Sequence, residues 1–82
     1  MENYFVYAIK SRKDKRIYVG ISRNPQKRLK EHSDGRVKST KFYRPWVLIY
    51  KKFSGSRAEA RKEEKRLKSG FGKEFLKFNI PV

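Results

Sequence analysis

Hydrophobic residues occur in short blocks along this chain, and their spacing predicts three β-strands. Residues 4–10, 16–22 and 46–53 are rich in aromatic and β-branched side chains, which favour strands over helices. Because only the polar, turn-like residues 11–15 separate the first two blocks, we predict that these two form an antiparallel hairpin.

The second predicted strand carries a glycine close to a tyrosine. Side chains alternate along a strand, so Ile17, Val19 and Ile21 share one face. Tyr18 and Gly20 share the other face, which therefore has a bare spot at the glycine. A glycine inside a strand often marks the close approach of a ligand or of another backbone segment.

Two longer helices are predicted from their capping residues. Asn24 followed by Pro25 is a typical helix start, and this helix is expected to run to about residue 33, where Asp34-Gly35 ends it. Its residues are nearly all polar, with Leu29 as the one clear apolar anchor.

The remaining stretch completes the predicted fold. Ser56 can cap a helix that runs to about residue 69, where Gly70 ends it, and residues 71–82 hold a possible short last helix and a tail. The order β-β-α-β-α predicts an α+β domain, in which helices flank a three-stranded antiparallel sheet. A chain of 82 residues is expected to form a single domain over residues 1–82.

The charge of the chain points to a polyanionic partner. Lys and Arg number 23 against 8 acidic residues, which gives a formal net charge of +15. Phosphates release counterions when such cations neutralise them, so nucleic acid is the favoured partner. A solubilising role and a membrane surface are the alternatives, but the charge is spread along the chain and no long amphipathic basic helix is visible.

Several kinds of site are excluded by composition. The chain has no cysteine and one histidine, so disulfides, thiol nucleophiles and zinc clusters are not expected. Its few scattered glycines form no phosphate-binding loop. No signal peptide or membrane-length apolar run is visible, and we expect a cytoplasmic protein without a membrane partner.

Acidic residues on the second predicted helix are candidates for a metal site. Ala60 and Leu67 mark its inward face, and both Glu63 and Glu64 lie near the edge of that face. If Phe71 extends the apolar stripe, Glu64 is the closer of the two. From the helical spacing alone, an ordinary surface carboxylate that pairs with Lys68 is the favoured interpretation.

Basic and aromatic residues elsewhere in the chain can likewise be interpreted either as site residues or as ordinary surface and core residues. Arg28 and His32 are four residues apart and share a helix face, from which a guanidinium can bind a phosphate with two hydrogen bonds. From the pattern alone, a solvated basic helix is the favoured interpretation of these two residues. Tyr7 and Tyr18 on the paired strands also fit ordinary core aromatics.

Taken together, the chain resembles the GIY-YIG nuclease family. The two triplets that name the family correspond to Val6-Tyr7-Ala8, with Ile9 behind it, and to Tyr18-Val19-Gly20. Arg28 follows Tyr18 by ten residues, and His32 comes four residues later. The first triplet has Val6 where the family has glycine, and its isoleucine is displaced, but the tyrosine is kept.

Further matches extend over most of the chain, from Tyr4 to about Phe75. Arg44-Pro45-Trp46 precedes the third predicted strand as in the small stand-alone members of the family. Ala60, followed by Glu64 and Leu67-Lys68, also matches, and it favours Glu64 over Glu63. An asparagine downstream of the glutamate often lines the family's site, and Asn79 is the candidate here.

The resemblance implies hydrolysis of phosphodiester bonds in DNA with one Mg²⁺ or Mn²⁺ ion. Glu64 would hold the ion, with water and phosphate oxygens in the other positions. Arg28 would bind the scissile phosphate and offset the charge that grows in the transition state. The expected role is structure-selective or weakly sequence-selective cleavage in DNA repair, recombination or processing.

The general base stays open among Tyr7, Tyr18 and His32. A free phenol has a pKa near 10, and a nearby Arg28 and metal ion would lower the pKa of a tyrosine. His32, with an ordinary pKa near 6.5, would be the base itself or would relay a proton from a tyrosine.

DNA contacts are expected from a basic loop, residues 35–45, in which cations alternate with aromatic residues. The candidates are Arg36, Lys38, Thr40, Lys41 and Arg44. The DNA is expected to be single-stranded, duplex or branched, and the protein a monomer or a homodimer. A non-catalytic nucleic-acid-binding module that keeps the fold, or an RNA-associated protein, is the alternative.

Overall fold

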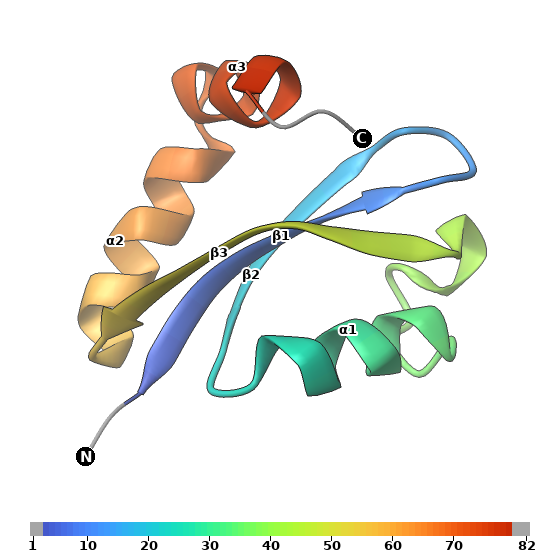
Figure 1. Cartoon of the computed structure of the whole chain (residues 1–82), viewed down its shortest axis with the longest axis horizontal. Helices are drawn as coiled ribbons and strands as arrows, with labels where there is room; N and C mark the ends of the chain where they lie inside the picture. Colours follow the sequence, from blue (N-terminus) through green and yellow to red (C-terminus); the bar gives the residue numbers. More distant parts are fainter. Residues whose placement is uncertain (1–2, 80–82) are drawn as a thin grey trace.

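The structure, a computed structural model, describes residues 3–79 and the side chains as far as residue 77. β1 (Tyr4–Ser11) and β2 (Ile17–Ser22) form the predicted antiparallel hairpin, and β3 (Trp46–Gly55) pairs antiparallel with the other side of β1. The strand order is therefore β2-β1-β3, in which β1 is the central strand and β2 lies at an edge (Figure 1).

Three α-helices complete the domain: α1 (Pro25–Ser33), α2 (Arg57–Lys68) and α3 (Gly70–Asn79). The predicted capping residues begin the first two, because the Asn24 side chain accepts from the Lys27 N–H and the Ser56 hydroxyl accepts from the Glu59 N–H, both at 3.1 Å. The predicted α+β class with a three-stranded antiparallel sheet is confirmed, with the order β-β-α-β-α-α. None of the helices in residues 3–79 is long and apolar enough to cross a membrane.

The corner between α2 and α3 differs from the expectation. Ser69 caps α2, and Gly70 starts α3 instead of only ending α2. Phe71 is 74% exposed and does not extend the apolar stripe of α2, whereas Leu76 is buried. A Cβ at Gly72 would lie 2.4 Å from the Arg66 carbonyl oxygen, so only a glycine lets α3 turn this closely onto α2.

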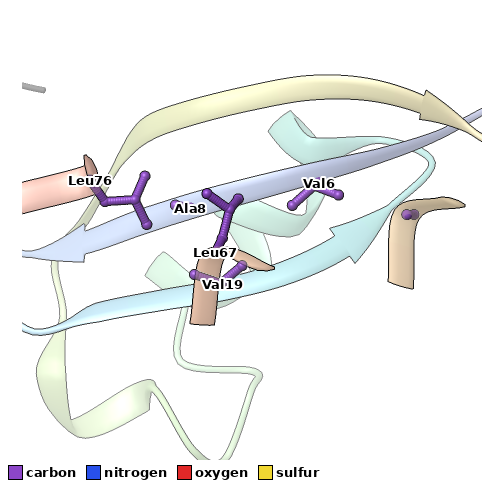
Figure 2. Close-up of a cluster of buried hydrophobic side chains, with 6 residues drawn as sticks. Val6, Ala8, Val19, Leu67 and Leu76 are labelled. Atoms are coloured by element: carbon purple, nitrogen blue, oxygen red, sulfur yellow. The ribbon is translucent and has the colours of Figure 1, made fainter. Parts of the chain in front are cut away.

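Two apolar clusters lie on the two faces of the sheet, because neighbouring residues of β1 point in opposite directions. Figure 2 shows the first cluster, in which side chains of β1 and β2 meet Leu67 of α2 and Leu76 of α3. Its fully or largely buried members are Val6, Ala8, Val19, Ala60, Leu67 and Leu76.

The second cluster lies on the face that α1 covers. Tyr7, Ile9 and Trp46 are its buried members, and Leu29 of α1 packs against them together with Tyr18. The predicted division of β2 is confirmed, since Ile17, Val19 and Ile21 belong to the first cluster and Tyr18 to the second. The candidate tyrosines therefore share the face that carries α1.

Candidate active site

Tyr7 lies at the centre of the candidate site, on β1 and 1% exposed. Its register partner on β2 is Gly20. A Cβ at Gly20 would lie 2.8 Å from the hydroxyl oxygen of Tyr7 and 3.1 Å from the ring of Tyr18. The bare spot that the sequence predicts is therefore filled by a phenol of the chain itself, and any larger residue at Gly20 would displace it.

His32 of α1 binds the hydroxyl group of Tyr7. The Tyr7 oxygen lies 3.0 Å from Nε2 of His32, and Nδ1 lies 2.8 Å from Oγ1 of Thr40. His32 is fully buried, so α1 is anchored by a histidine in addition to Leu29, which is only partly buried. Although nearly all residues of α1 are polar, the helix buries the imidazole of His32 against Tyr7 and Thr40.

The direction of these hydrogen bonds follows from the number of protons available. The Thr40 hydroxyl donates to the Val37 carbonyl oxygen at 3.3 Å, so its oxygen accepts from Nδ1–H of His32. A neutral imidazole has one N–H, and Nε2 is therefore free to accept the hydroxyl proton of Tyr7. Tyr7 is the donor in this pair, and His32 is its proton acceptor.

Burial dominates the ionisation of both groups. The pKa of Tyr7 is raised to about 12, because burial and, to a smaller extent, Tyr18 outweigh the guanidinium of Arg28, which lowers it. Arg28 lowers the pKa of Tyr7 as expected, but desolvation outweighs it, so without a bound metal ion the net shift is upward. Burial likewise lowers the pKa of His32 from 6.5 to about 4, with a further contribution from Arg28 that Glu31 opposes.

The buried imidazole predicts that the protein loses stability in mild acid. The pKa of His32 is about 4 in the folded chain and about 6.5 when unfolded, so between these values the unfolded chain binds more protons. The contribution of neutral His32 to the free energy of unfolding is therefore fully present above pH 6.5. It is lost progressively as the pH drops towards 4. We expect a loss of roughly 2 kcal/mol between pH 7.5 and pH 5, measured by urea unfolding at each pH.

His32→Gln provides the control for this prediction. His32 is the single histidine of the chain, and the variant should remove most of the pH dependence between pH 6.5 and pH 5. Carboxylates titrate mainly below this window. An equal slope in both proteins would contradict a buried neutral imidazole, as would an NMR titration that places the pKa of His32 near 6.5.

Arg28 and Tyr18 complete the cluster on this face. The ring centroids of Tyr18 and His32 are 4.9 Å apart, and those of Tyr18 and Tyr7 are 6.4 Å apart. Nη1 of Arg28 binds Oε1 of Glu31 at 2.8 Å, and its side chain remains 38% exposed. Four of the five side chains predicted for catalysis are thus brought together, with a cation at the surface of the cluster.

Glu64, the fifth, lies on α2, which packs against the other face of the sheet. It is 8% exposed and lies on the buried side of its helix with Ala60 and Leu67. Its carboxylate pairs with Arg61 at 3.4 Å and with Lys68 at 3.3 Å, so the predicted pairing with Lys68 is present. Among residues 3–79, the polar partners of this carboxylate are Arg61 and Lys68. No ion pair or hydrogen bond within these residues links it to Arg28 or to a tyrosine.

Glu63 points towards a different part of the molecule. Its carboxylate accepts from Arg66 at 3.1 Å and pairs with Lys52 of β3 at 3.7 Å. Lys68, the partner of Glu64, instead lines a cavity that also includes Tyr18 of β2. Glu64 is therefore connected through Lys68 to the cavity beside β2, and Glu63 is connected through Lys52 to β3.

The donor set decides which metal this chain can hold. In the described part of the chain, no three His, Asp or Glu side chains are close enough to enclose an ion. A lone carboxylate suits Mg²⁺ or Mn²⁺, which keep several water ligands and take phosphate oxygens from a substrate. Glu64 is the candidate carboxylate for such an ion, and the two cations that pair with it have side chains 55% exposed.

The basic loop contributes two different kinds of residue. Arg36, Lys38, Lys41 and Arg44 are exposed, and Phe42 between them is 66% exposed. Thr40 is 1% exposed and holds His32, so it is not at the surface with the other candidates for DNA contact. The Thr40 carbonyl oxygen also accepts from the Trp46 indole N–H at 2.9 Å, which fixes the loop to the start of β3.

Sequence patterns gave no signal for this role of Thr40. Thr40 follows His32 by eight residues through a loop without periodicity, and only the folded path of the loop brings them together. Asn79 is the last residue of α3, and its side chain lies outside the described residues.

Comparison with known proteins shows which family the chain is similar to. The family model described as the GIY-YIG catalytic domain matches residues 3–79. A UPF0213 protein of Staphylococcus haemolyticus is 36% identical over 70 residues, which cover 84% of each chain. UPF0213 proteins of Staphylococcus saprophyticus and Staphylococcus aureus are 33% identical over the same share of each chain. No solved structure matches.

Proposed function

Because this chain belongs to the GIY-YIG family, we propose that it is an endonuclease that hydrolyses phosphodiester bonds in DNA with one Mg²⁺ or Mn²⁺ ion. The observation that carries the proposal is the cluster on the α1 face of the sheet. There Tyr7 and Tyr18 come from paired strands, His32 accepts the hydroxyl proton of Tyr7, and Arg28 stands at the surface. Such a cluster combines a proton acceptor with a phosphate-binding cation.

Arg28 would bind the scissile phosphate. A guanidinium offers two parallel hydrogen bonds to phosphate oxygens and keeps its charge at every accessible pH. Its pairing with Glu31 holds the side chain beside Tyr7 before the substrate arrives. A donor that is already in place stabilises the charge developing on the phosphate without a further cost of reorganisation.

Tyr7 and His32 would act together on the attacking water. A phenol with a pKa of about 12 stays protonated near neutral pH and cannot act as a standing phenolate base. Its oxygen can accept a proton from water as its own proton passes to Nε2 of His32, 3.0 Å away. Burial keeps His32 neutral near pH 7, so Nε2 has a free lone pair for this proton. Because its pKa of about 4 also makes it a weak base, the transfer would have to occur together with the attack of the water on the phosphate.

Glu64 would hold the metal ion, with water and phosphate oxygens as the other ligands. When bound, the ion supplies the positive charge that steadies the leaving oxygen and polarises the phosphate. Arg61 and Lys68 would move from the carboxylate to nearby phosphates as the DNA arrives. Their exposed side chains have the freedom to do so.

The basic loop would bind the flanking DNA. Its exposed cations suit phosphate contact, and the exposed ring of Phe42 suits stacking on a base. Neither kind of contact reads a base sequence, so we propose structure-selective or weakly sequence-selective cleavage, in repair, recombination or processing of DNA.

The proposal is tested by incubating the purified protein with supercoiled plasmid, single-stranded oligonucleotide and branched DNA. We expect cleavage of at least one substrate in Mg²⁺ or Mn²⁺, and none when EDTA removes the metal. Denaturing gels resolve nicks from full cuts. Tight, salt-sensitive binding without cleavage of any substrate, with protein in molar excess, would instead support a non-catalytic DNA-binding module.

A further inference from the structure

A cavity of about 650 Å³ lies between the β1–β2 hairpin, β2 and the corner of α2 with α3. Its volume falls within the ~300–1,000 Å³ typical of sites that enclose a small molecule or a single nucleotide. Apolar side chains from both layers line it, including Ile17 and Val19 of β2, Leu67 of α2 and Leu76 of α3. The cavity therefore has room and an apolar wall for a flat, uncharged ring.

Positive charge surrounds this apolar wall. Among the described residues that line the cavity there is one acid, Glu74, against six cations. The cations are Lys10, Lys15, Arg16, Lys68, Lys73 and Lys77. An apolar interior with a cationic rim matches a nucleotide, whose base is a flat ring and whose phosphates are anionic.

Two residues connect the cavity with the candidate active site. Tyr18 lines the cavity, and its ring lies 4.9 Å from the ring of His32. Lys68 also lines it and pairs with Glu64 at 3.3 Å. The cavity therefore lies on the α2 and α3 face, next to Glu64 through Lys68, and it borders the edge strand β2, whose Tyr18 ring contacts His32 on the α1 face.

We propose that the cavity holds one unpaired base of the DNA strand next to the cleaved bond, and that the rim lysines bind its flanking phosphates. The proposal rests on the nuclease function and adds the form of the substrate. A base inside a duplex must be unpaired and unstacked before it can enter, at a cost of a few kcal/mol. The protein therefore prefers single-stranded, frayed or branched DNA over intact duplex.

Matched sets of lysines separate the cavity from the general positive charge. One variant replaces Lys15, Lys73 and Lys77 on the rim by glutamine, and these side chains make no ion pair in the described part of the chain. The control replaces Lys51, Lys62 and Lys65, which are exposed and do not line the cavity. Both variants lose the same charge.

Binding of a fluorescent single-stranded oligonucleotide is measured in EDTA, so that no cleavage occurs. We expect the rim variant to lose about tenfold more affinity than the control, and to lose the preference for single strands over duplex. Its slope of log affinity against log salt should fall by about 2, because three single-strand phosphate contacts are removed. Equal losses in the two variants would overturn the proposal.

An abasic scan tests whether a base, rather than a phosphate alone, occupies the cavity. Each base of a short oligonucleotide is removed in turn while the phosphates stay. For the wild-type protein, one or two positions should weaken binding by about tenfold, a size typical of a lost base contact. A flat profile would overturn the proposal, since contacts with phosphates alone do not depend on the base.

The binding experiments and the cleavage experiment can each contradict one proposal without affecting the other. Metal-dependent cleavage together with a flat abasic profile would overturn the role of the cavity and leave the nuclease function intact. A position-dependent profile without cleavage of any substrate would keep the cavity as a base-binding site and overturn the nuclease function.

Discussion

Replacing Arg28 by alanine is expected to lower the rate of DNA cleavage by a factor on the order of 10²–10³, a size typical of the loss of one preorganised donor. The guanidinium lies beside Tyr7 at the surface of the cluster, where a phosphate can reach it. The loss should appear in the single-turnover rate at saturating protein. Binding should weaken much less, because many other cations contribute to it.

The fold should tolerate this substitution. The Arg28–Glu31 pair is partly exposed on both sides, and such pairs contribute roughly 0–1 kcal/mol. Thermal unfolding of the variant should therefore stay close to that of the wild type. Arg28→Lys keeps the charge but not the two parallel hydrogen bonds, and we expect an intermediate rate.

Lys30→Ala is the matched control for Arg28, because Lys30 lies exposed on the same helix and carries the same charge. It should change the cleavage rate by less than about threefold, since it removes only one of many surface charges. Equal rates for Arg28→Ala and Lys30→Ala would mean that the cation at this surface does not take part in the reaction.

The fold was predictable where its signals are local. The caps at Asn24 and Ser56 act on the next helical turn, and the alternation along β2 decides which face each side chain occupies. The α2–α3 corner was not predictable in the same way. Which apolar side chain of α3 turns inward depends on the close contact at Gly72, so Leu76 is buried and Phe71 is exposed.

In the candidate site, too, features with a local signal in the sequence were predictable, and features that depend on the folded path of the chain were not. The spacing of Tyr18, Arg28 and His32 predicts a shared surface, and the structure brings them together around Tyr7. The sequence predicts that Arg28 lowers the pKa of Tyr7, which it does, but not the depth of burial, which raises that pKa by more. The support of His32 by Thr40 depends on the path of a loop and has no pattern in the sequence.

The choice between Glu63 and Glu64 rested on family resemblance, and the structure supplies a physical reason for it. Glu63 is held by Arg66 and by Lys52 of β3, so its carboxylate serves to fasten α2 to the sheet. The cations that pair with either glutamate have side chains about half exposed, but Glu64 pairs with two cations of its own helix, and one of them, Lys68, lines the cavity beside Tyr18. On our proposal, Glu64 would exchange these partners for a metal ion without loosening α2 from β3.

Glu64→Gln should therefore lower cleavage by a factor on the order of 10³, because a bound divalent ion is worth several kcal/mol to the transition state. Glutamine keeps the size of the side chain and an oxygen for Arg61 and Lys68, so the fold should persist. Raising Mg²⁺ or Mn²⁺ to millimolar excess should restore little of the rate, since a neutral amide oxygen is a weak ligand for a hard cation.

Glu63→Gln, one residue away on the same helix, is the matched control. It removes the same charge and loosens contacts with Arg66 and Lys52, so it should cost some stability but leave the cleavage rate and the metal requirement near those of the wild type. If Glu63→Gln is the inactive variant and Glu64→Gln cleaves normally, the metal ligand has been assigned to the wrong carboxylate. If both cleave normally, neither Glu63 nor Glu64 holds the ion, and Glu31, which lies beside Arg28, is the next carboxylate to test.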